Sequence, residues 1–298
     1  MSRLARYAWF VLVFNVGVII LGALVRATGS GAGCGESWPT CQGEIIPDLS
    51  GATSIEFLHR SVSGFALALV AILAIWVWRS EPKGAPARAG AWISLIAIIG
   101  EALIGAMIVV SRWVADDDSV ARAIAVPLHL VNTFFLLAAL TLTAHWLSGG
   151  LPIDIRSNRT TWRWLLAGAG AILLISATGA ITALADTLFP KEGIGLDLTE
   201  GAHFLTRLRV VHPILAVVAA VIAWWRLGPA ARSAGARTVV LLVGAMMLSG
   251  VLNVAFGVPV WMQLVHLALA DALWIAYVLL GARLLGSGVR AREALIAE

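Results

Sequence analysis

Long apolar stretches separated by short polar segments are the dominant pattern of this chain. A helix that crosses a membrane needs about 20 mostly apolar residues, and several stretches of that length occur. They run approximately over residues 8–25, 58–78, 91–111, 124–146, 163–184, 208–226, 237–257 and 261–285. The pattern therefore predicts an all-α integral membrane protein with eight transmembrane helices.

Composition also favours the bilayer as the solvent of this chain. Hydrophobic residues make up 60% of the 298 positions, the mean hydropathy is +0.90, and only 13% of the residues are charged. A typical soluble domain has about 25% charged residues. The net charge is +4, but the basic residues are spread over short loops. That distribution indicates membrane topology and predicts no nucleic-acid partner.

The loops alternate in charge along the chain. Fourteen of the 21 basic residues lie in loops on the side of the amino terminus, whereas most acidic residues lie in the other loops. Because Arg and Lys are enriched in cytoplasmic loops, we expect a multi-pass protein of the cell (plasma) membrane with both termini cytoplasmic. The two long loops, roughly 26–57 and 185–207, are then expected on the outer face.

Short similar segments recur in the same order in the two halves of the chain. Residues 22–25 resemble 179–182, residues 103–107 resemble 248–252, and residues 128–130 resemble 265–267. Equivalent helices are four spans apart, so the halves would be parallel repeats. This predicts two pseudo-symmetric four-helix bundles, over residues 1–150 and 151–298.

Four histidines fall near the outer ends of predicted helices, on the second and fourth helix of each half. They are His59, His129, His212 and His266. Facing imidazoles at one depth can hold a haem iron between them, and an ionisable group inside a membrane is by default functional. We expect two haem sites near the outer face, one per half. Structural histidines, a metal site or a proton pathway are the alternatives.

An acid accompanies the first histidine pair but not the second. Glu56 precedes His59 by three residues and shares a helix face with it, whereas Arg209 stands at that distance before His212. A carboxylate suits proton transfer or stabilisation of a developing cation, and arginine suits anionic haem propionates. This predicts one reactive site and one resident-cofactor site. Alternatively, Glu56 is a helix N-terminal acid paired with Arg60.

Two cysteines and two further acids carry other expectations. Cys34 and Cys41 lie seven residues apart in the predicted outer loop, where an oxidising environment favours a disulfide. Two free thiols are the alternative. The sequence does not distinguish a redox-active disulfide from a structural one. Glu101 and Asp271 lie within predicted spans. Their role is either structural or in proton or electron coupling.

The sequence resembles the haem A synthase family over nearly its whole length. The matching residues are 22–31, Cys34, Trp38, Pro39, Cys41, Gly43, 56–60, His129, His212 and His266. The resemblance implies a membrane oxidoreductase that oxidises one methyl group of haem O to a formyl group through successive hydroxylations. The product, haem A, would serve terminal oxidases.

The resemblance also implies roles for individual residues. The substrate haem O would be bound by His59, His129 and Arg60. A haem b cofactor would be bound by His212, His266 and Arg209. Glu56 would be catalytic, and a Cys34–Cys41 disulfide would shape the loop above the substrate. Haem O synthase, oxidase assembly factors and an electron donor that the sequence does not identify are the implied protein partners. The chain departs from the family at Glu101, where Gln is expected, at Asp271, where an uncharged residue is expected, and by having no second Cys pair.

Two other functions are compatible with paired histidines. A quinol-linked di-haem b-type protein would transfer electrons and leave both haems unchanged. A haem carrier would bind and deliver the substrate without any chemistry. The oligomeric state is not predicted.

Overall fold

The computed structural model describes residues 1–156, 158–190 and 199–286, so parts of the predicted second loop and of the predicted half 151–298 lie outside the described residues. Regular structure in these ranges is helical, apart from two isolated β-bridges. The helices are α1 (Arg3–Ala27), the short 3-10 helix η1 (Ser30–Ala32), α2 (Gly51–Ser80), α3 (Pro86–Val110), α4 (Val120–Leu147), α5 (Arg159–Leu188), α6 (Phe204–Leu208), α7 (Val211–Leu227), α8 (Ala234–Ala255) and α9 (Val260–Leu284).

Eight helical segments among the described residues are long and apolar enough to cross a membrane, with α6 and α7 together forming the sixth. The prediction of an all-α integral membrane protein is therefore confirmed. Many of the large apolar side chains on these helices are exposed, among them Ile96, Leu174 and Trp225. Such exposure is expected where the surrounding solvent is lipid.

Several helices begin earlier than the apolar stretches indicate. α2 starts at Gly51, seven residues before the predicted boundary, and α4 starts at Val120, where Ser119 accepts a hydrogen bond from the Arg122 N–H at 3.2 Å. Hydropathy marks only the apolar part of a helix, whereas a capping residue marks its first turn. Glu56 and His59 consequently lie inside α2 rather than at its start.

The sixth span is broken at its start, and α7 covers the predicted stretch 208–226 except for its first three residues. α6 ends at Leu208 and α7 begins at Val211. Pro213 has no N–H to donate to the carbonyl of Arg209, four residues earlier. In the first turn of a helix the missing donor costs little, so α7 restarts with His212 and Pro213 in its opening turn.

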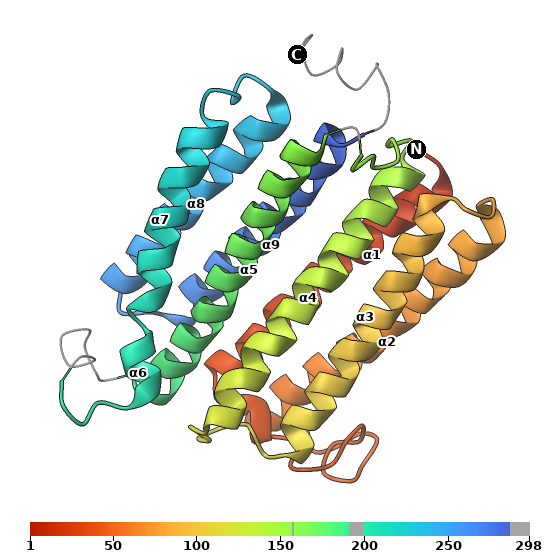
Figure 1. Ribbon diagram of the computed structural model, residues 1–298. Coiled ribbons are helices and arrows are strands. Elements are labelled where there is room, and N and C mark those ends of the chain that lie inside the picture. Colours follow the sequence, from red (N-terminus) through yellow and green to blue (C-terminus); the bar gives the residue numbers. More distant parts are fainter. Residues whose placement is uncertain (157, 191–198, 287–298) are drawn as a thin grey trace.

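The helices form two adjacent groups (Figure 1). In the first, α1, α2, α3 and α4 pack in cyclic order, and in the second, α5, α7, α8 and α9 do the same. α1 and α4 pack against α5 and α9, where the Phe134 and Trp274 rings stack 5.5 Å apart. The pseudo-symmetry and the boundary at residue 150 stay predictions.

The two ends of the helical groups differ. The start of α1 and the end of α9 lie at one end, whereas the loop after α1 and the short helix α6 lie at the other (Figure 1). The described parts of the two segments predicted to be the long outer loops therefore share a side.

Candidate functional site

The four predicted histidines lie at similar distances from the helix ends beside α6 and the loop after α1. His59 is the ninth residue of α2, His129 the tenth of α4, His212 the ninth counted from Phe204, and His266 the seventh of α9. At a rise of about 1.5 Å per residue, these positions are about 9–14 Å from the helix starts. All four histidines thus lie a similar distance into their helices from that end.

His212 and His266 face one another across the second helical group. Their ring centres are 6.3 Å apart, and the ring planes make an angle of 83°. A metal held between two imidazole nitrogens, with bonds of about 2 Å, places the ring centres about 6 Å apart. A porphyrin supplies four nitrogens and needs only two axial ligands from the protein, so this pair fits a haem iron.

The hydrogen bonds of these two histidines involve Nδ1 and leave Nε2 available to a metal. His212 Nδ1 lies 3.0 Å from the carbonyl oxygen of Ile175, which can only accept. His266 Nδ1 lies 2.8 Å from Ser249 Oγ, whose own proton is donated to the Met246 carbonyl. His212 Nδ1 therefore carries the hydrogen, and His266 Nδ1 carries it when the Ser249 proton is directed to Met246; each Nε2 then keeps its lone pair for a metal.

In the first group, His129 has a carboxylate partner. Its Nδ1 lies 2.8 Å from Glu101 Oε2. The N–H direction does not point at Oε2, so this is a close contact with the carboxylate rather than a hydrogen bond. Glu101 Oε1 accepts from the Asn132 amide at 2.6 Å, and the Thr133 hydroxyl lies 3.1 Å from Oε2. Glu101 is thereby tied to α4.

Unlike the other three histidines, His59 has no close polar contact at Nδ1 among the described residues. Its Nδ1 is buried and has no hydrogen-bond partner among the described residues. His59 and His129 are close enough to interact electrostatically. The His59 ring packs against Gly22 of α1, where an added Cβ would lie 2.9 Å from Cε1.

The same glycine contact occurs in the second group. A Cβ on Gly179 of α5 would lie 2.9 Å from Cε1 of His212. Real side chains almost never approach so closely, so either histidine ring would have to move if its glycine were replaced. Gly22 and Gly179 are the first residues of the repeated segments 22–25 and 179–182. The recurrence of glycine there has a steric reason, since a histidine ring packs against each.

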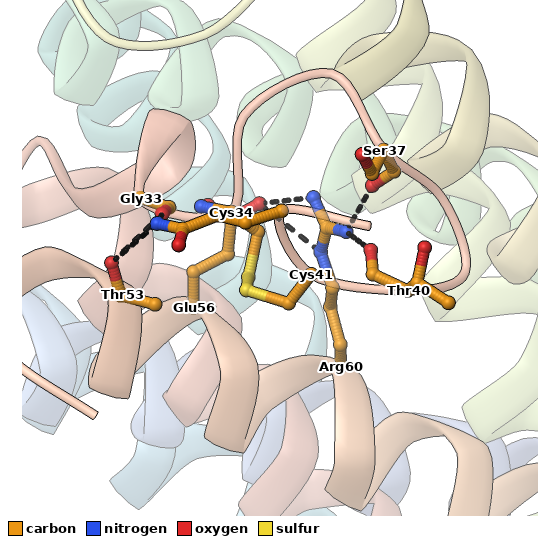
Figure 2. Close-up of a disulfide and its surroundings, with 9 residues drawn as sticks. Gly33, Cys34, Ser37, Thr40, Cys41, Thr53, Glu56 and Arg60 are labelled. Atoms are coloured by element: carbon orange, nitrogen blue, oxygen red, sulfur yellow. Dashed lines mark hydrogen bonds and ion pairs between the residues drawn. A yellow bond between two sulfur atoms is a disulfide. The ribbon is translucent and has the colours of Figure 1, made fainter. Parts of the chain in front are cut away.

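Glu56 and Arg60 hold the loop after α1 onto α2 (Figure 2). Glu56 is 3% exposed; its Oε1 pairs with Arg60 Nη2 at 2.6 Å, and its Oε2 accepts from the Cys34 N–H at 2.8 Å. Arg60 Nη1 also donates to the carbonyls of Ser37 and Thr40. The structure therefore shows the pairing of Glu56 with Arg60, and the catalytic role of Glu56 stays a prediction.

The loop itself is closed by the predicted disulfide between Cys34 and Cys41, which is confirmed (Figure 2). Gly33 sits directly on the start of α2, where a Cβ would lie 2.5 Å from the backbone of Ala52. The Gly33 carbonyl accepts from the Thr53 hydroxyl at 2.8 Å. Only glycine allows this approach, so the loop is fixed above the first turns of α2.

Arg209, like Arg60, is engaged with protein groups. It is 8% exposed, donates to the carbonyls of Ala185 and Phe189 at 2.7 and 2.8 Å, and pairs with Asp186 at 3.1 Å. It thus ties the start of α7 to the end of α5. Its predicted contact with a haem propionate, and that of Arg60, stay predictions.

The remaining predicted acid is isolated. Asp271 is fully buried in α9, and neither carboxyl oxygen has a hydrogen-bond partner within the described ranges. Nor does the described part of the chain hold a group of three or more His, Cys, Asp or Glu side chains placed to bind a metal ion. The candidate metal ligands accordingly come in pairs.

Sequence reasoning missed the partners of the histidines. Ser249 and Ile175 were not predicted, because a serine or a backbone carbonyl in an apolar stretch carries no chemical signal. The available clue to Ser249 was its place beside Gly250 in a repeated segment. Arg26, which donates from α1 to the Gln263 side chain of α9 at 2.9 Å, was also missed.

These observations define a class of protein, namely an eight-span membrane protein with a histidine at a similar position in each of four spans, two of which face one another. Residues 5–54 and 50–278 match the family described as "Cytochrome oxidase assembly protein" (COX15-CtaA). The chain belongs to this family, and the resemblance to haem A synthases is confirmed.

Individual relatives match the chain to different extents. A Thermus thermophilus protein named protoheme IX farnesyltransferase is 47% identical over 305 aligned positions, which cover 98% of this chain and 50% of that protein. Heme A synthases of Alkalihalophilus pseudofirmus and Geobacillus kaustophilus are 45% and 41% identical over 33% and 41% of this chain, and over 35% and 38% of their own lengths. The chain spans about half the length of the Thermus relative.

Proposed function

We propose that this chain is a haem A synthase that oxidises a methyl group of haem O to a formyl group. The observation that carries the proposal is the pairing of histidines at one depth, with His212 and His266 separated as two axial ligands of one iron would be. Family membership supports it, because relatives named Heme A synthase match this chain.

The two sites have different roles in this proposal. His212 and His266 hold haem b, which supplies one-electron redox chemistry when bound. His59 and His129 hold the substrate haem O in the first group. Both sites lie towards the outer face, and both termini are cytoplasmic, as the distribution of basic residues predicts.

Glu56 is the acid of the substrate site. It is one helical turn from His59, and a carboxylate in a low-dielectric site can accept a proton or stabilise positive charge. Its contact with the Cys34 N–H couples this carboxylate to the disulfide-closed loop. Glu56→Gln, which keeps the shape and removes the charge, should retain both haems and stop before the formyl product.

Haem content of four variants tests the division of labour. His212→Ala or His266→Ala should remove haem b, because each deletes one axial ligand of that site. His59→Ala or His129→Ala should spare haem b and abolish conversion of haem O. Haem extraction and mass analysis of the purified proteins measure both outcomes. Equal loss of haem b from all four variants would contradict the assignment.

A second candidate follows from the relative named for farnesyl transfer, which aligns with 98% of this chain. In that case the chain would act on protohaem and a prenyl diphosphate. Supplying the purified protein with either protohaem and farnesyl diphosphate or haem O separates the two functions. A formyl-bearing haem supports the first candidate, and a farnesylated haem supports the second. Two unchanged b-type haems would favour electron transfer instead.

A further inference from the structure

The four histidines differ in how firmly their rings are held. In the second group, both rings are anchored through Nδ1, one to the Ile175 carbonyl and one to the Ser249 hydroxyl. In the first group, neither Nδ1 makes a hydrogen bond within the described ranges, but His129 Nδ1 lies 2.8 Å from the Glu101 carboxylate, a contact that His59 lacks there. The site proposed for the resident cofactor thus has two hydrogen-bonded ligands, and the site proposed for the substrate has one ligand in contact with a carboxylate.

Of the three groups that lie at these Nδ1 atoms, the one beside His129 is the strongest acceptor, because it is a carboxylate. A hydrogen bond from Nδ1–H to a carboxylate fixes the tautomer and raises the basicity of Nε2 as a ligand, more than a carbonyl or hydroxyl acceptor does. Glu101 is itself fixed in position. The Asn132 amide nitrogen donates both to Glu101 Oε1 at 2.6 Å and to the Ala97 carbonyl at 2.9 Å, so its orientation is set by two acceptors.

The anchor is particular to the first group. In the repeated segments of α3 and α8, Glu101 corresponds to Met246, and Ser249 corresponds to Ile104. The partner of His129 on α3 and the partner of His266 on α8 therefore occupy positions in the repeated segments that differ by about one helical turn. Of these two partners, only the one beside the substrate site is a carboxylate.

Resting on the proposed function, we propose that His129, positioned by Glu101, is the ligand that retains iron throughout, and that His59 is the ligand released when haem O enters and haem A leaves. Release of His59 breaks no Nδ1 contact within the described ranges, whereas release of His129 would separate its Nδ1 from Glu101 Oε2 inside the membrane, which is costly even though Asn132 and Thr133 still donate to that carboxylate. Glu101 is a positioning residue, because it acts on the haem through His129.

Single glycine substitutions test the inequality of the two ligands. The full-length protein, loaded with haem b and haem O, is compared with His59→Gly and His129→Gly. His59→Gly should retain haem O and bind carbon monoxide rapidly when reduced, because one axial position is open. His129→Gly should lose haem O, with an affinity about 10–100-fold lower. Equal retention of haem O in the two variants would overturn the proposal.

Glu101→Gln tests the positioning role by a property that a merely structural role would not change. Loss of the carboxylate should shift the midpoint potential of the haem O site upwards, leave that of haem b unchanged and lower haem O affinity about 10-fold. Glu101→Asp should restore part of both. Glu44→Gln, on the exposed loop, is the control for charge, and haem b content reports folding. An unchanged potential and affinity in Glu101→Gln would contradict the role of Glu101.

Failure of this inference is distinguishable from failure of the proposed function. If the unmodified protein forms haem A but the two glycine variants retain haem O equally, only the assignment of the retained ligand fails. If the unmodified protein forms no formyl product from haem O, the proposed function itself fails.

Discussion

At the scale of single residues, one hydroxyl selects the nitrogen that His266 offers to a metal. The Ser249 hydroxyl lies 2.9 Å from the Met246 carbonyl and 2.8 Å from His266 Nδ1, so it accepts from Nδ1 when its own proton is donated to that carbonyl. Without it, either nitrogen could carry the hydrogen, and the ring would be free to rotate. The hydrogen-bond partner of a metal ligand thus matters almost as much as the ligand.

Ser249→Ala tests this dependence. We expect haem b to be retained about 10-fold more weakly, because partners of ligating histidines typically contribute that much or more to affinity. Haem titration of the purified protein, followed by its absorbance, measures the change. Ser94→Ala is the control: Ser94 is also buried and bonds the Gly90 carbonyl, away from the histidines. Unchanged affinity in Ser249→Ala would contradict the prediction.

Asp271 presents the opposite case, a polar group without partners among the described residues. Replacing a buried, unpaired carboxyl with an apolar side chain of similar volume removes its desolvation cost. Asp271→Leu should therefore raise the free energy of unfolding by about 1–3 kcal/mol, measured as loss of haem b absorbance on heating in detergent. A lower stability would show that the carboxyl has a partner essential to the fold.

The positions of the histidines could be predicted from the sequence, but their surroundings could not. An imidazole within an apolar stretch stands out, and its place near one end of a span follows from counting residues. Whether its ring meets Glu101, Ser249 or nothing depends on the rotation of one helix against another. A difference of one turn, as between Glu101 and Ser249 in the repeated segments, leaves the hydropathy pattern unchanged.

At the scale of elements, the disulfide loop and α2 behave as one unit. Arg60 uses one guanidinium nitrogen for the Ser37 and Thr40 carbonyls and two others for Glu56. The Cys34 N–H completes the link by bonding the same carboxylate. The loop is therefore attached to the helix that carries His59, as well as being closed on itself.

Arg60→Gln tests this attachment. The loop should open more often, with its local opening free energy lowered by about 1–3 kcal/mol, because Glu56 and two carbonyls lose a donor. Hydrogen exchange of the amides of residues 33–43 measures the change. Arg112→Gln, which breaks an exposed ion pair with Glu36, should leave exchange nearly unaltered. Equal exchange in the two variants would show that Arg60 does not attach the loop to α2.

The number and type of the elements followed from hydropathy, whereas their interruptions did not. Apolar stretches of about 20 residues leave little choice but helices, since backbone groups in lipid must bond internally. The break between α6 and α7 arises from Pro213 acting on a carbonyl four residues earlier, within an apolar context that hides it. The early start of α2 was missed because its first turn is polar.

At the scale of the whole molecule, Arg26 joins the two helical groups. From the end of α1 it donates to the Ala183 carbonyl at 2.6 Å and the Thr187 hydroxyl at 2.7 Å on α5, and to Gln263 on α9. Gln263 lies three residues before His266, so the first group helps to fix a helix that carries a ligand of the second.

Arg26→Gln should weaken the attachment between the groups. We expect the free energy of unfolding to fall by about 2–4 kcal/mol, because three acceptors lose a charged donor, and thermal loss of haem b to occur at lower temperature. Arg6→Gln, an exposed cation on the same helix, is the control. Identical melting of the two variants would show that α5 and α9 are held without Arg26.

A guanidinium that reaches from one bundle into the other has a consequence for dissecting the chain. If the chain were cut in the connection between α4 and α5, the fragment with His212 and His266 would lack Arg26, which donates to Thr187 and Gln263 of that fragment. Such a fragment should become competent only when the complementary piece is synthesised beside it.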